Sequence, residues 1–450
     1  MADNGAQFTI DELPDIPDSW QWRRLGDLVD QTRGICYGIV QPGRHDESGV
    51  PMVNSQDVLD GTVASRIEFR VAKELHARFK RSTIRGGEVL LTLVGANFGR
   101  VAIAPSSFAG FNCSRAVGII PVREHPQFVM FCLRSPLTRR FLDNWANTTA
   151  QPTFNLKEVA NLPIPFPPLP EQKAIAAVLG ALDDKIELNR RMNATLEAMA
   201  RALFQSWFVD FDPVRAKLDG RPPAALAPAT AALFPEHFAH GEHDMLPVGW
   251  RHAAIEEVCA INAWTLGKND DLETLEYVEI SEVSRGNIAN IATYPRGEEP
   301  SRARRRLRHG DTVLSTVRPD RGSYFLALNP SENRVASTGF AVLTPTKVPW
   351  SFIHAALTQP EVSDHLGQMA DGGAYPAVRP EIIGAIQAAL PNEPKILEAF
   401  HRTCAPLFEQ AEANRTQSRT LATLRDTLLP KLLSGELSVA SLNAKPEAAR

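Results

Sequence analysis

One long helix-forming run occurs twice in this chain, and no other feature limits its fold so strongly. The first run, residues 169–211, reads LPEQKAIAAVLGALDDKIELNRRMNATLEAMARALFQSWFVDF, and the second spans residues 391–435. In both, apolar or small residues recur at alternating spacings of three and four, the pattern by which two helices bury a shared stripe. A helix of roughly 37 residues is about 55 Å long, which is more than a compact domain needs. Each run therefore needs a partner, and the other copy supplies it.

The stripe of each run is mainly aliphatic, with asparagine at a few positions. Asn189 of the first run aligns with Asn414 of the second, which places Met199 level with Leu424 in the repeat. Polar residues in such a stripe fix register and orientation, unless they lie off it and face water. Pro406 lies inside the second run, and we expect it to kink or break the helix there. The predicted helix-pairing residues are Leu182, Ile186, Asn189, Asn193, Leu196, Leu203, Leu407, Asn414, Leu421, Leu424 and Leu428.

The repetition extends into the segments that precede each helix. Residues 84–91, IRGGEVLL, match residues 307–314, LRHGDTVL. Trp20 and Trp250 each follow a similar short motif, and we expect both to be core anchors. The chain is therefore predicted to be two copies of a globular domain, each followed by a long helix.

Within each copy the local patterns are mixed, which predicts an α+β fold. Short β-branched runs bounded by Gly, Pro or Asn are typical of strands, and they fall at residues 88–94, 101–104, 116–122, 312–317 and 341–344. Two segments that end before a Ser-Pro or Gln-Pro pair predict helices, at residues 127–133 and 351–358. The expected boundaries are a first globular domain at 1–168, a long helix at 169–212, a Pro/Ala-rich connector at 213–245, a second globular domain at 246–390, a long helix at 391–437 and a loose tail at 438–450.

The composition is that of an ordinary soluble protein, with 44% hydrophobic and 22% charged residues in 450. No apolar run approaches the ~20 residues that span a bilayer, and the N-terminus lacks a signal-peptide core, so we expect a cytoplasmic protein. The five cysteines are scattered and are expected to be reduced structural thiols. The formal net charge of −4 excludes a uniformly basic surface. Any DNA binding must therefore come from local patches.

No catalytic motif stands out. The chain has neither a GxxxxGK[ST] phosphate loop nor a GxGxxG turn, and Asn329-Pro330-Ser331 is not the Asn-Pro-Pro-aromatic tetrapeptide of an amino-methyltransferase. His237, His240 and His243 recur every third residue, but the surrounding Gly and Pro provide no rigid element, so we expect no metal site. We expect that the chain is not an enzyme.

Basic charge gathers at equivalent positions of both copies. Residues 66–85 and residues 301–322 each hold seven basic and two acidic side chains. Such clusters contact phosphates, and arginine also binds guanine edges, although a solvated face is the alternative. Four loops differ in sequence between the copies, at residues 95–100, 148–153, 318–322 and 372–377. Recognition of two different half-sites would produce this difference, and so would random sequence drift. The candidate DNA-binding residues are Arg78, Lys80, Arg81, Arg85, Asn97, Arg100, Thr148, Thr149, Gln151, Arg302, Arg304, Arg305, Arg306, Arg308, Arg318, Arg321 and Tyr375.

Three motifs together resemble the specificity subunit of type I restriction-modification systems. They are PLPEQ at residues 168–172, LLPKLLSGEL at residues 428–437, and the paired strand starts Gly87-Glu88 and Gly310-Asp311. The likeness covers nearly the whole chain. It departs from the family pattern before the second helix, where LPNEP at residues 390–394 replaces PLPEQ.

The resemblance implies two target-recognition domains, each reading one half of a bipartite DNA sequence, with the long helices paired antiparallel as a spacer. It also implies a non-catalytic subunit that recruits two methyltransferase subunits and an ATP-dependent restriction subunit. The chain itself would bind no cofactor, because S-adenosylmethionine, ATP and Mg²⁺ are used by the partners. A duplicated coiled-coil scaffold without DNA specificity is the alternative, and a nuclease is disfavoured by the missing carboxylate–lysine signature.

Overall fold

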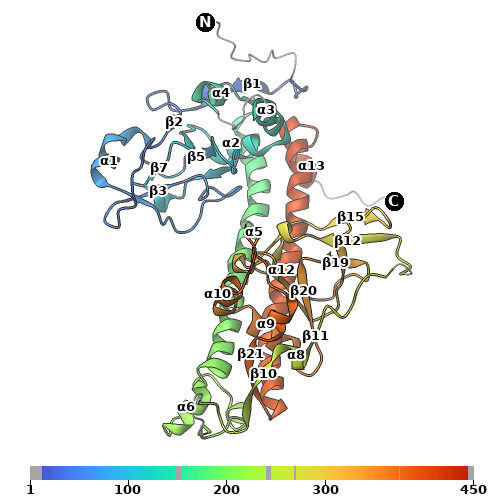
Figure 1. Cartoon of the computed structure of the whole chain (residues 1–450). Helices are drawn as coiled ribbons and strands as arrows, with labels where there is room; N and C mark the ends of the chain where they lie inside the picture. The colour runs from blue at the N-terminus through green and yellow to red at the C-terminus, as the bar shows by residue number, and fades with distance from the viewer. Residues whose placement is uncertain (1–12, 147–153, 240–244, 268–269, 374, 444–450) are drawn as a thin grey trace. The chain divides into compact units, whose positions relative to one another are not determined.

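The computed structural model describes residues 13–146, 154–239, 245–267, 270–373 and 375–443. The chain divides into two compact units, one made of Met1–Glu187 with Ser418–Arg450 and the other of Leu188–Gln417. Helices α5 (Leu169–Phe204) and α12 (Pro394–Ser434) contribute to both units (Figure 1).

The first unit is built on an antiparallel sheet with strand order β2-β8-β5-β6. Its central strand reads VLLT and is buried at every position. Alternate side chains face opposite sides: Val89 and Leu91 join the cluster that includes Phe128 of α2, while Leu90 joins a second cluster. The bounds are β2 Cys36–Tyr37, β5 Val89–Thr92, β6 Val101–Ile103, β8 Val117–Ile120 and α2 Pro126–Arg134.

Two smaller sheets complete the first unit, with strand orders β4-β3-β7 and β1-β9. Their bounds are β1 Gln21–Arg24, β3 Val50–Val53, β4 Arg70–Val71, β7 Asn112–Cys113 and β9 Pro163–Phe166. The remaining helices are η2 Leu25–Leu28, α1 Lys73–Arg78, η3 Lys80–Ser82, η4 Ser106–Phe108, α3 Pro136–Ala146, α4 Leu156–Ala160 and α13 Val439–Asn443.

The second unit repeats this plan, since its main sheet has the antiparallel order β11-β20-β17-β18. The central strand β17 is buried at all five positions. Helix α9 packs on β17 and β20, and its Phe352 lies 5.7 Å from the Phe204 ring of α5. The bounds are β11 Cys259–Ile261, β17 Asp311–Ser315, β18 Tyr324–Ala327, β20 Phe340–Pro345 and α9 Trp350–Leu357.

Three further sheets belong to the second unit, with orders β15-β12-β19-β16, β10-β21 and β13-β14. Their bounds are β10 Trp250–Ala254, β12 Thr274–Val278, β13 Val283–Ser284, β14 Asn287–Ile288, β15 Ala292–Pro295, β16 Ala303–Arg306, β19 Arg334–Ser337 and β21 Gln387–Pro391. The helices are a π-helix at Gln205–Val209, α6 Asp212–Leu218, α7 Pro228–Ala231, α8 Ile255–Val258, η6 Ile280–Glu282, η7 Pro319–Arg321, α10 Pro360–Gln368 and α11 Pro380–Gly384.

The α+β fold with two copies of one globular plan is confirmed, because the main sheets of the two units share one strand order. The strands and short helices predicted from the sequence are present, each within two residues of the expected ends. Trp20 and Trp250 are both buried, as expected of core anchors. The indole Nε1 of Trp20 also donates a hydrogen bond to Glu171 at 3.0 Å, which ties the domain to the start of α5.

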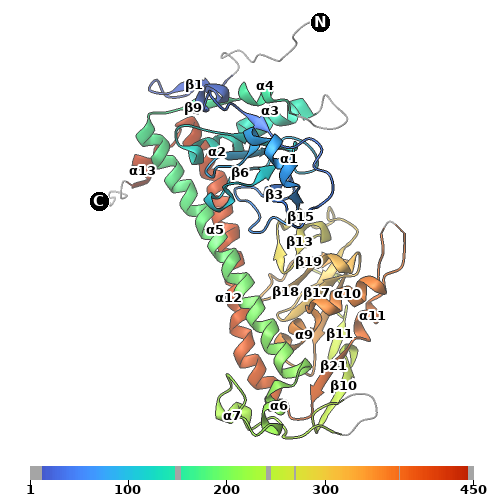
Figure 2. The same cartoon turned by 90° about the vertical axis from the view of Figure 1, so that its left-hand side faces the viewer.

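The long helices lie side by side and antiparallel within each unit (Figure 2). In the first unit, Ile175 and Leu179 of α5 pack in one cluster with Leu429 and Leu432 of α12. In the second unit, α5 packs with the beginning of α12, through Phe204 and Phe400 among others. Residue numbers on one helix therefore fall as those on the other rise.

The break predicted at Pro406 is wrong. Helix α12 runs without interruption from Pro394 to Ser434. Pro406 is exposed, whereas Cys404, Ala405 and Phe408 are buried. A proline ring on the solvent side removes one helical hydrogen bond at a place where water can solvate the carbonyl. Packing of the opposite face then holds the helix together.

The predicted connector folds onto the second unit. Besides α6 and α7 it places Phe234 in the core, with its ring 5.1 Å from that of Trp207 and perpendicular to it. In the tail predicted to be loose, Val439–Asn443 forms α13, and residues from 444 lie outside the described part. Among the helices that the structure describes, none has the length and apolar character needed to cross a bilayer.

Candidate nucleic-acid interface

The basic residues of the first copy precede its central strand. Arg78 ends α1, Lys80 and Arg81 lie in η3, and Arg85 follows, all four of them exposed. The guanidinium of Arg81, however, donates to the backbone carbonyl of Arg33 at 2.8 Å. Arg81 therefore holds the fold together in addition to facing water.

A buried ion pair anchors the turn into β5. Arg33 Nη1 lies 2.5 Å from Glu88 Oε1, and the two side chains are only 4% and 6% exposed. The same carboxylate accepts a hydrogen bond from the backbone N–H of Arg85 at 2.8 Å. This explains the Gly-Glu motif, since the carboxylate fixes the turn that starts the central strand.

The equivalent acidic residue of the second copy, Asp311, forms no ion pair among the described residues. Asp311 is completely buried, and its carboxylate accepts from the Thr344 hydroxyl and from the backbone N–H of Arg308, both at 2.7 Å. Burial raises the pKa of Asp311 to about 6, although these hydrogen bonds and Arg308 oppose the shift. The two copies therefore stabilise the same turn by different means.

Asn97 and Arg100 lie at the opposite end of β5. The loop is closed by hydrogen bonds from the backbone N–H groups of Gly99 and Arg100 to Thr92, at 3.0 and 2.8 Å. The side-chain amide of Asn97 donates to the carbonyl of Ser55 at 3.3 Å. Thr148, Thr149 and Gln151, the other candidates expected near this loop, lie outside the described residues.

The arginines on β16 in the second copy mostly serve the fold. Arg304 lies 3.7 Å from Glu299, and Arg306 lies 3.4 Å from Asp270. The Arg305 Nε is buried, without a hydrogen-bond partner among the described residues, and burial lowers the pKa of its guanidinium. Arg302, which precedes β16, is exposed.

Arg308 stacks on an aromatic side chain that the sequence analysis did not single out. Its guanidinium carbon lies 3.1 Å from the ring centre of Trp264, which is 37% exposed. Trp264 and Arg308 line a groove of about 590 Å³ together with His309 and Asn329. No local pattern marks Trp264, because its partner lies in a distant segment.

Arg318 and Tyr375 meet at the other end of β17, and Arg321 lies beside them in η7. The Arg318 guanidinium carbon lies 4.8 Å from the ring centre of Tyr375, a side chain that is 73% exposed. The loop at 318–322 thus contacts the loop at 372–377, which the sequence suggested only as separate variable segments. As in the first copy, the candidates fall into two groups separated by the length of the central strand.

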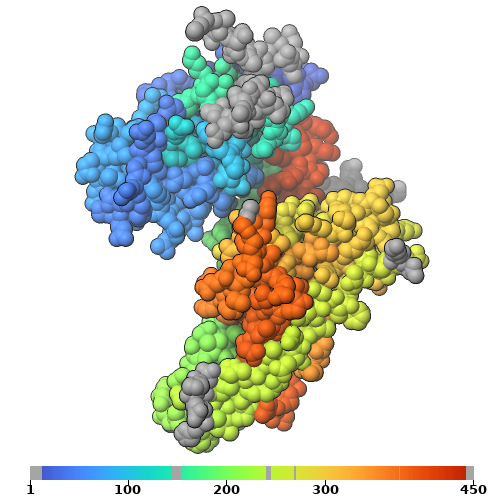
Figure 3. Space-filling view, viewed as in Figure 1, coloured from blue at the N-terminus to red at the C-terminus, as the bar shows by residue number. Residues whose placement is uncertain are grey.

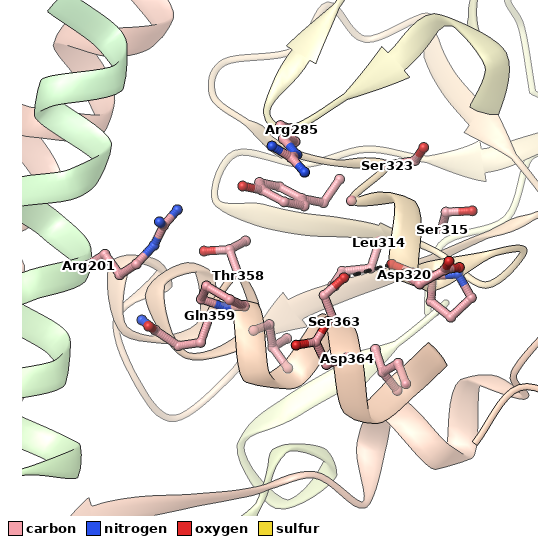
Figure 4. A pocket seen from close by; sticks show the side chains of 16 residues that line it. Arg201, Arg285, Leu314, Ser315, Asp320, Ser323, Thr358, Gln359, Ser363 and Asp364 are labelled. Carbon is pink, nitrogen blue, oxygen red and sulfur yellow. Dashed lines mark hydrogen bonds between the residues drawn. The ribbon is translucent and has the colours of Figure 1, made fainter. Parts of the chain in front are cut away.

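A pocket of about 240 Å³ lies beside this loop (Figure 4). Figure 4 shows Arg201 reaching in from α5 and Arg285 from above, with Asp320 and Asp364 on the other sides. One wall is η7, which follows Arg318 directly. The lining contains no histidine or cysteine, the side chains that most often provide a base or thiolate near neutral pH.

The predicted asparagines of the helix stripe join the two helices in the second unit. The amide of Asn189 donates to the Asn414 carbonyl at 3.2 Å and to Gln417 at 2.9 Å. The amide of Asn193 donates to the Ala411 carbonyl at 3.0 Å. These polar side chains are buried and do not face water.

The aliphatic candidates vary more. Leu203 and Leu407 pack against the core of the second unit, and Leu428 packs against that of the first. Those that are only half-buried are Leu182, Ile186, Leu196 and Leu421. Leu424 corrects the prediction, since it is 45% exposed while its neighbour Arg425 is largely buried against Asp183 at 2.7 Å. At about 100° per residue, Leu424 lies roughly 80° around the helix from Asn414, whereas Arg425 lies within roughly 20° of it, so the buried stripe passes through Arg425.

Sequence reasoning also missed the clamp around Asp183. Its two carboxylate oxygens lie 2.5 Å from Arg134 of α2 and 2.7 Å from Arg425 of α12, so one acid joins the domain to both helices in the first unit. Asp183 is 49 residues from Arg134 and 242 residues from Arg425 in the sequence, so no local pattern could have predicted this cluster.

Side chains that could carry catalysis are few in the described residues. No group of three or more His, Cys, Asp or Glu there could hold a metal ion. His240 and His243 lie outside those residues. The five cysteines are buried and unpaired, and burial raises the pKa of Cys259 and Cys404 to about 12. Such thiols are poor nucleophiles.

Comparison with known proteins places this architecture in a family. The family model described as type I restriction modification DNA specificity domain matches residues 17–198. The specificity subunit of the type I enzyme HindI from Haemophilus influenzae is 25% identical over 474 aligned residues, which cover 93% of this chain and 99% of that protein.

Two further comparisons agree. The EcoBI specificity subunit of Escherichia coli is 32% identical over 199 residues, or 42% of each chain. The crystal structure of the S subunit from M. genitalium shares the fold with a TM-score of 0.54 and 15% identity, covering 95% of this chain and 98% of that one. With its two copies of one α+β plan and its two long helices, this chain matches the family's DNA specificity domain at residues 17–198 and is similar over most of its length to a specificity subunit of a type I restriction enzyme.

Proposed function

We propose that this chain is the DNA-recognition subunit of a type I restriction-modification complex. Each globular copy reads one half of a bipartite target in double-stranded DNA, and the helix pair sets the gap between the halves. The chain does no chemistry and binds no cofactor. It brings two methyltransferase subunits, which use S-adenosylmethionine, and an ATP- and Mg²⁺-dependent restriction subunit to the site, in the cytoplasm.

The repeated sheet carries this proposal. In both units the central strand, β5 or β17, ends at a loop bearing arginine, Arg100 in one case and Arg318 in the other. The loops differ in sequence, whereas the two sheets share one strand order. A constant scaffold with different loops is what two half-site readers require, because base edges are read by side chains and not by the framework.

An exposed apolar stripe on α5 supports the recruitment of partners. Leu188, Met192 and Met199 are 44%, 38% and 49% exposed, and they recur at helical spacing. Leu424, the repeat equivalent of Met199, is likewise exposed at 45%. Exposed apolar side chains that cluster on a helix mark protein contact surfaces. An exposed apolar position on each of the two long helices suits the binding of two copies of one partner.

The scaffold alternative lacks a comparable observation. A scaffold without DNA specificity gives no reason for exposed Arg and Tyr side chains on loops that differ between the copies. It also does not account for relatives named as specificity subunits.

The test is a genome-wide map of methylated adenine in the host strain, with and without this gene. We expect one two-part motif to disappear on deletion and to return when the gene is restored. If every methylated motif survives deletion, the chain is not the recognition subunit of an active methyltransferase.

A further inference from the structure

We infer that Arg318 and Tyr375 form the base-contacting pair of the second domain, and that the larger arginine cluster on β16 is structural. This inference rests on the proposed function, and it names the side chains by which one half of the target is read. From the sequence alone, residues 302–308 would be the stronger candidates for DNA contact, because they carry most of the positive charge in this part of the chain. The inference gives that role to Arg318 and Tyr375.

The backbone around Arg318 is fixed in an unusual conformation. Arg318 has a φ of +46°, which non-glycine residues rarely adopt. Its N–H donates to the Pro376 carbonyl and its carbonyl accepts from the N–H of Arg321, at 2.8 and 3.0 Å. The next residue, Pro319, accepts from the Ser363 hydroxyl of α10 at 2.9 Å, the dashed line in Figure 4. Such strain persists where surrounding contacts hold it, and it is frequent at functional sites.

Tyr375 lies on a second fixed loop. Two backbone hydrogen bonds between Asp371 and Ala377, of 3.1 and 2.8 Å, close this loop. It is attached to the end of β17 by a bridge between Val317 and Ala377 and by the N–H of Val378, which donates to Thr316 at 2.8 Å. Figure 3 shows the neighbouring α10, in orange, on the surface of the second unit.

The pair has the geometry of a preorganised reader. Stacking at 4.8 Å holds the guanidinium plane against an aromatic face, while Tyr375 remains 73% exposed. A guanidinium whose orientation is fixed loses less entropy on binding, and its parallel N–H groups match O6 and N7 of guanine. The exposed phenol offers a ring face and a hydroxyl to the neighbouring base.

The β16 arginines do not meet these requirements. Arg304 and Arg306 face Glu299 and Asp270, and Arg305 is partly buried at Nε. Arg308 lies flat on Trp264 at the opposite end of β17. To reach DNA, Arg306 would have to leave Asp270 without this cation, and Arg308 would have to leave the Trp264 ring.

The experiment uses the full chain co-expressed with its methyltransferase subunit, and reads methylated adenine across the genome and the methylation rate on a cognate duplex. Arg318→Lys keeps the positive charge but removes the planar guanidinium that can donate two parallel hydrogen bonds to one base. We expect a fall in rate of about 5- to 150-fold and a relaxed base in one half of the motif only. Tyr375→Ala should relax the same half, whereas Tyr375→Phe, which keeps the stack, should retain the motif.

Arg402→Ala is the matched control, because Arg402 is an exposed arginine of the same unit that is not among the candidate DNA-binding residues. It should keep the motif, and thermal unfolding should show all variants folded. Wild-type motif and rate for both Arg318→Lys and Tyr375→Ala would overturn the inference, as would a half-site change caused by Arg402→Ala. Absence of any two-part motif with the wild-type chain would instead overturn the proposed function.

Discussion

The side-chain amide of Asn189 in α5 donates to the backbone carbonyl of Asn414 in α12, and these residues occupy the same position in the two copies of the helix. A residue thus contacts its own repeat equivalent. The contact is polar and buried, and Gln417 and Asn193 bond to the same two residues, so only one sliding position of the helices satisfies this network. This makes the asparagines the natural determinants of helix register.

The first prediction concerns the adjoining pair, in which Asn414 donates to the side-chain oxygen of Asn193 at 2.9 Å. Asn414→Leu should lower the free energy of unfolding by about 1–3 kcal/mol, because a buried acceptor loses its donor. The double change Asn193→Leu with Asn414→Leu should recover much of that loss through apolar packing. Denaturant unfolding of the four proteins gives the coupling energy, with exposed Glu398→Ala as the control. Strictly additive losses would show that the two amides act independently.

The second prediction concerns the pH dependence contributed by Asp311. Its pKa in the folded state is about 6, above the ordinary value of 3.8, because the carboxyl is buried. The neutral form therefore favours folding: its contribution is complete below about pH 4 and is lost as the pH rises through about 6. Two pKa units correspond to about 2–3 kcal/mol.

Asp311→Asn removes this titration. The difference in unfolding free energy between the variant and wild type should rise by about 2–3 kcal/mol in the variant's favour from pH 4 to pH 7. The altered hydrogen bond to the Arg308 N–H adds a term that does not depend on pH. Denaturant titrations at several pH values measure this difference. Parallel curves for the two proteins would show that the carboxyl is ionised throughout.

The third prediction concerns the exposed apolar stripe. Met199→Lys and Leu424→Lys each place a charge in one proposed docking surface, so each should leave a complex with one methyltransferase subunit, and the double variant should have none. Native mass spectrometry of the co-expressed complex counts the subunits. Ala194→Lys, also exposed on α5 but about 140° around the helix from Met199, is the control. Full assembly of the double variant would place the docking surface elsewhere.

The fourth prediction concerns the spacer. One heptad inserted after Glu187 in α5 and another after Gln417 in α12, where the chain passes between the units, keeps the buried stripe in phase. Each insertion adds about 10 Å of helix, so the gap in the methylated motif should widen by about three base pairs while both half-sites keep their sequences. A gap of unchanged length would mean that the helices do not set it.

Local patterns in the sequence were enough to predict the two long helices, two of the short helices and several strands of the main sheets. Spacings of three and four predicted α5 and α12, and β-branched runs predicted the central strands β5 and β17, because these periods are set by which face of one segment is buried. Pro406 was misjudged for a related reason. Propensity treats the residue alone, whereas the cost of a proline depends on which side of the helix it occupies.

The interface was predicted less well, because charge in a sequence does not reveal its partner. Arg304 and Arg306 belong to an arginine-rich run, yet they pair with acids that the fold brings beside them. Arg318 and Tyr375 are 57 positions apart and became a pair only when two loops met at the end of β17.

The sequence by itself determined the duplicated α+β plan, the two long helices and the resemblance to type I specificity subunits, because repetition, periodicity and short motifs can be read without knowing which segments touch. Only the tertiary structure decided which arginines are bound within the fold, which carboxyl is buried without a cation, and which leucine leaves the helix stripe. Those outcomes depend on contacts between residues far apart in the chain, such as the one between Arg425 and Asp183 that occupies the buried stripe beside the exposed Leu424.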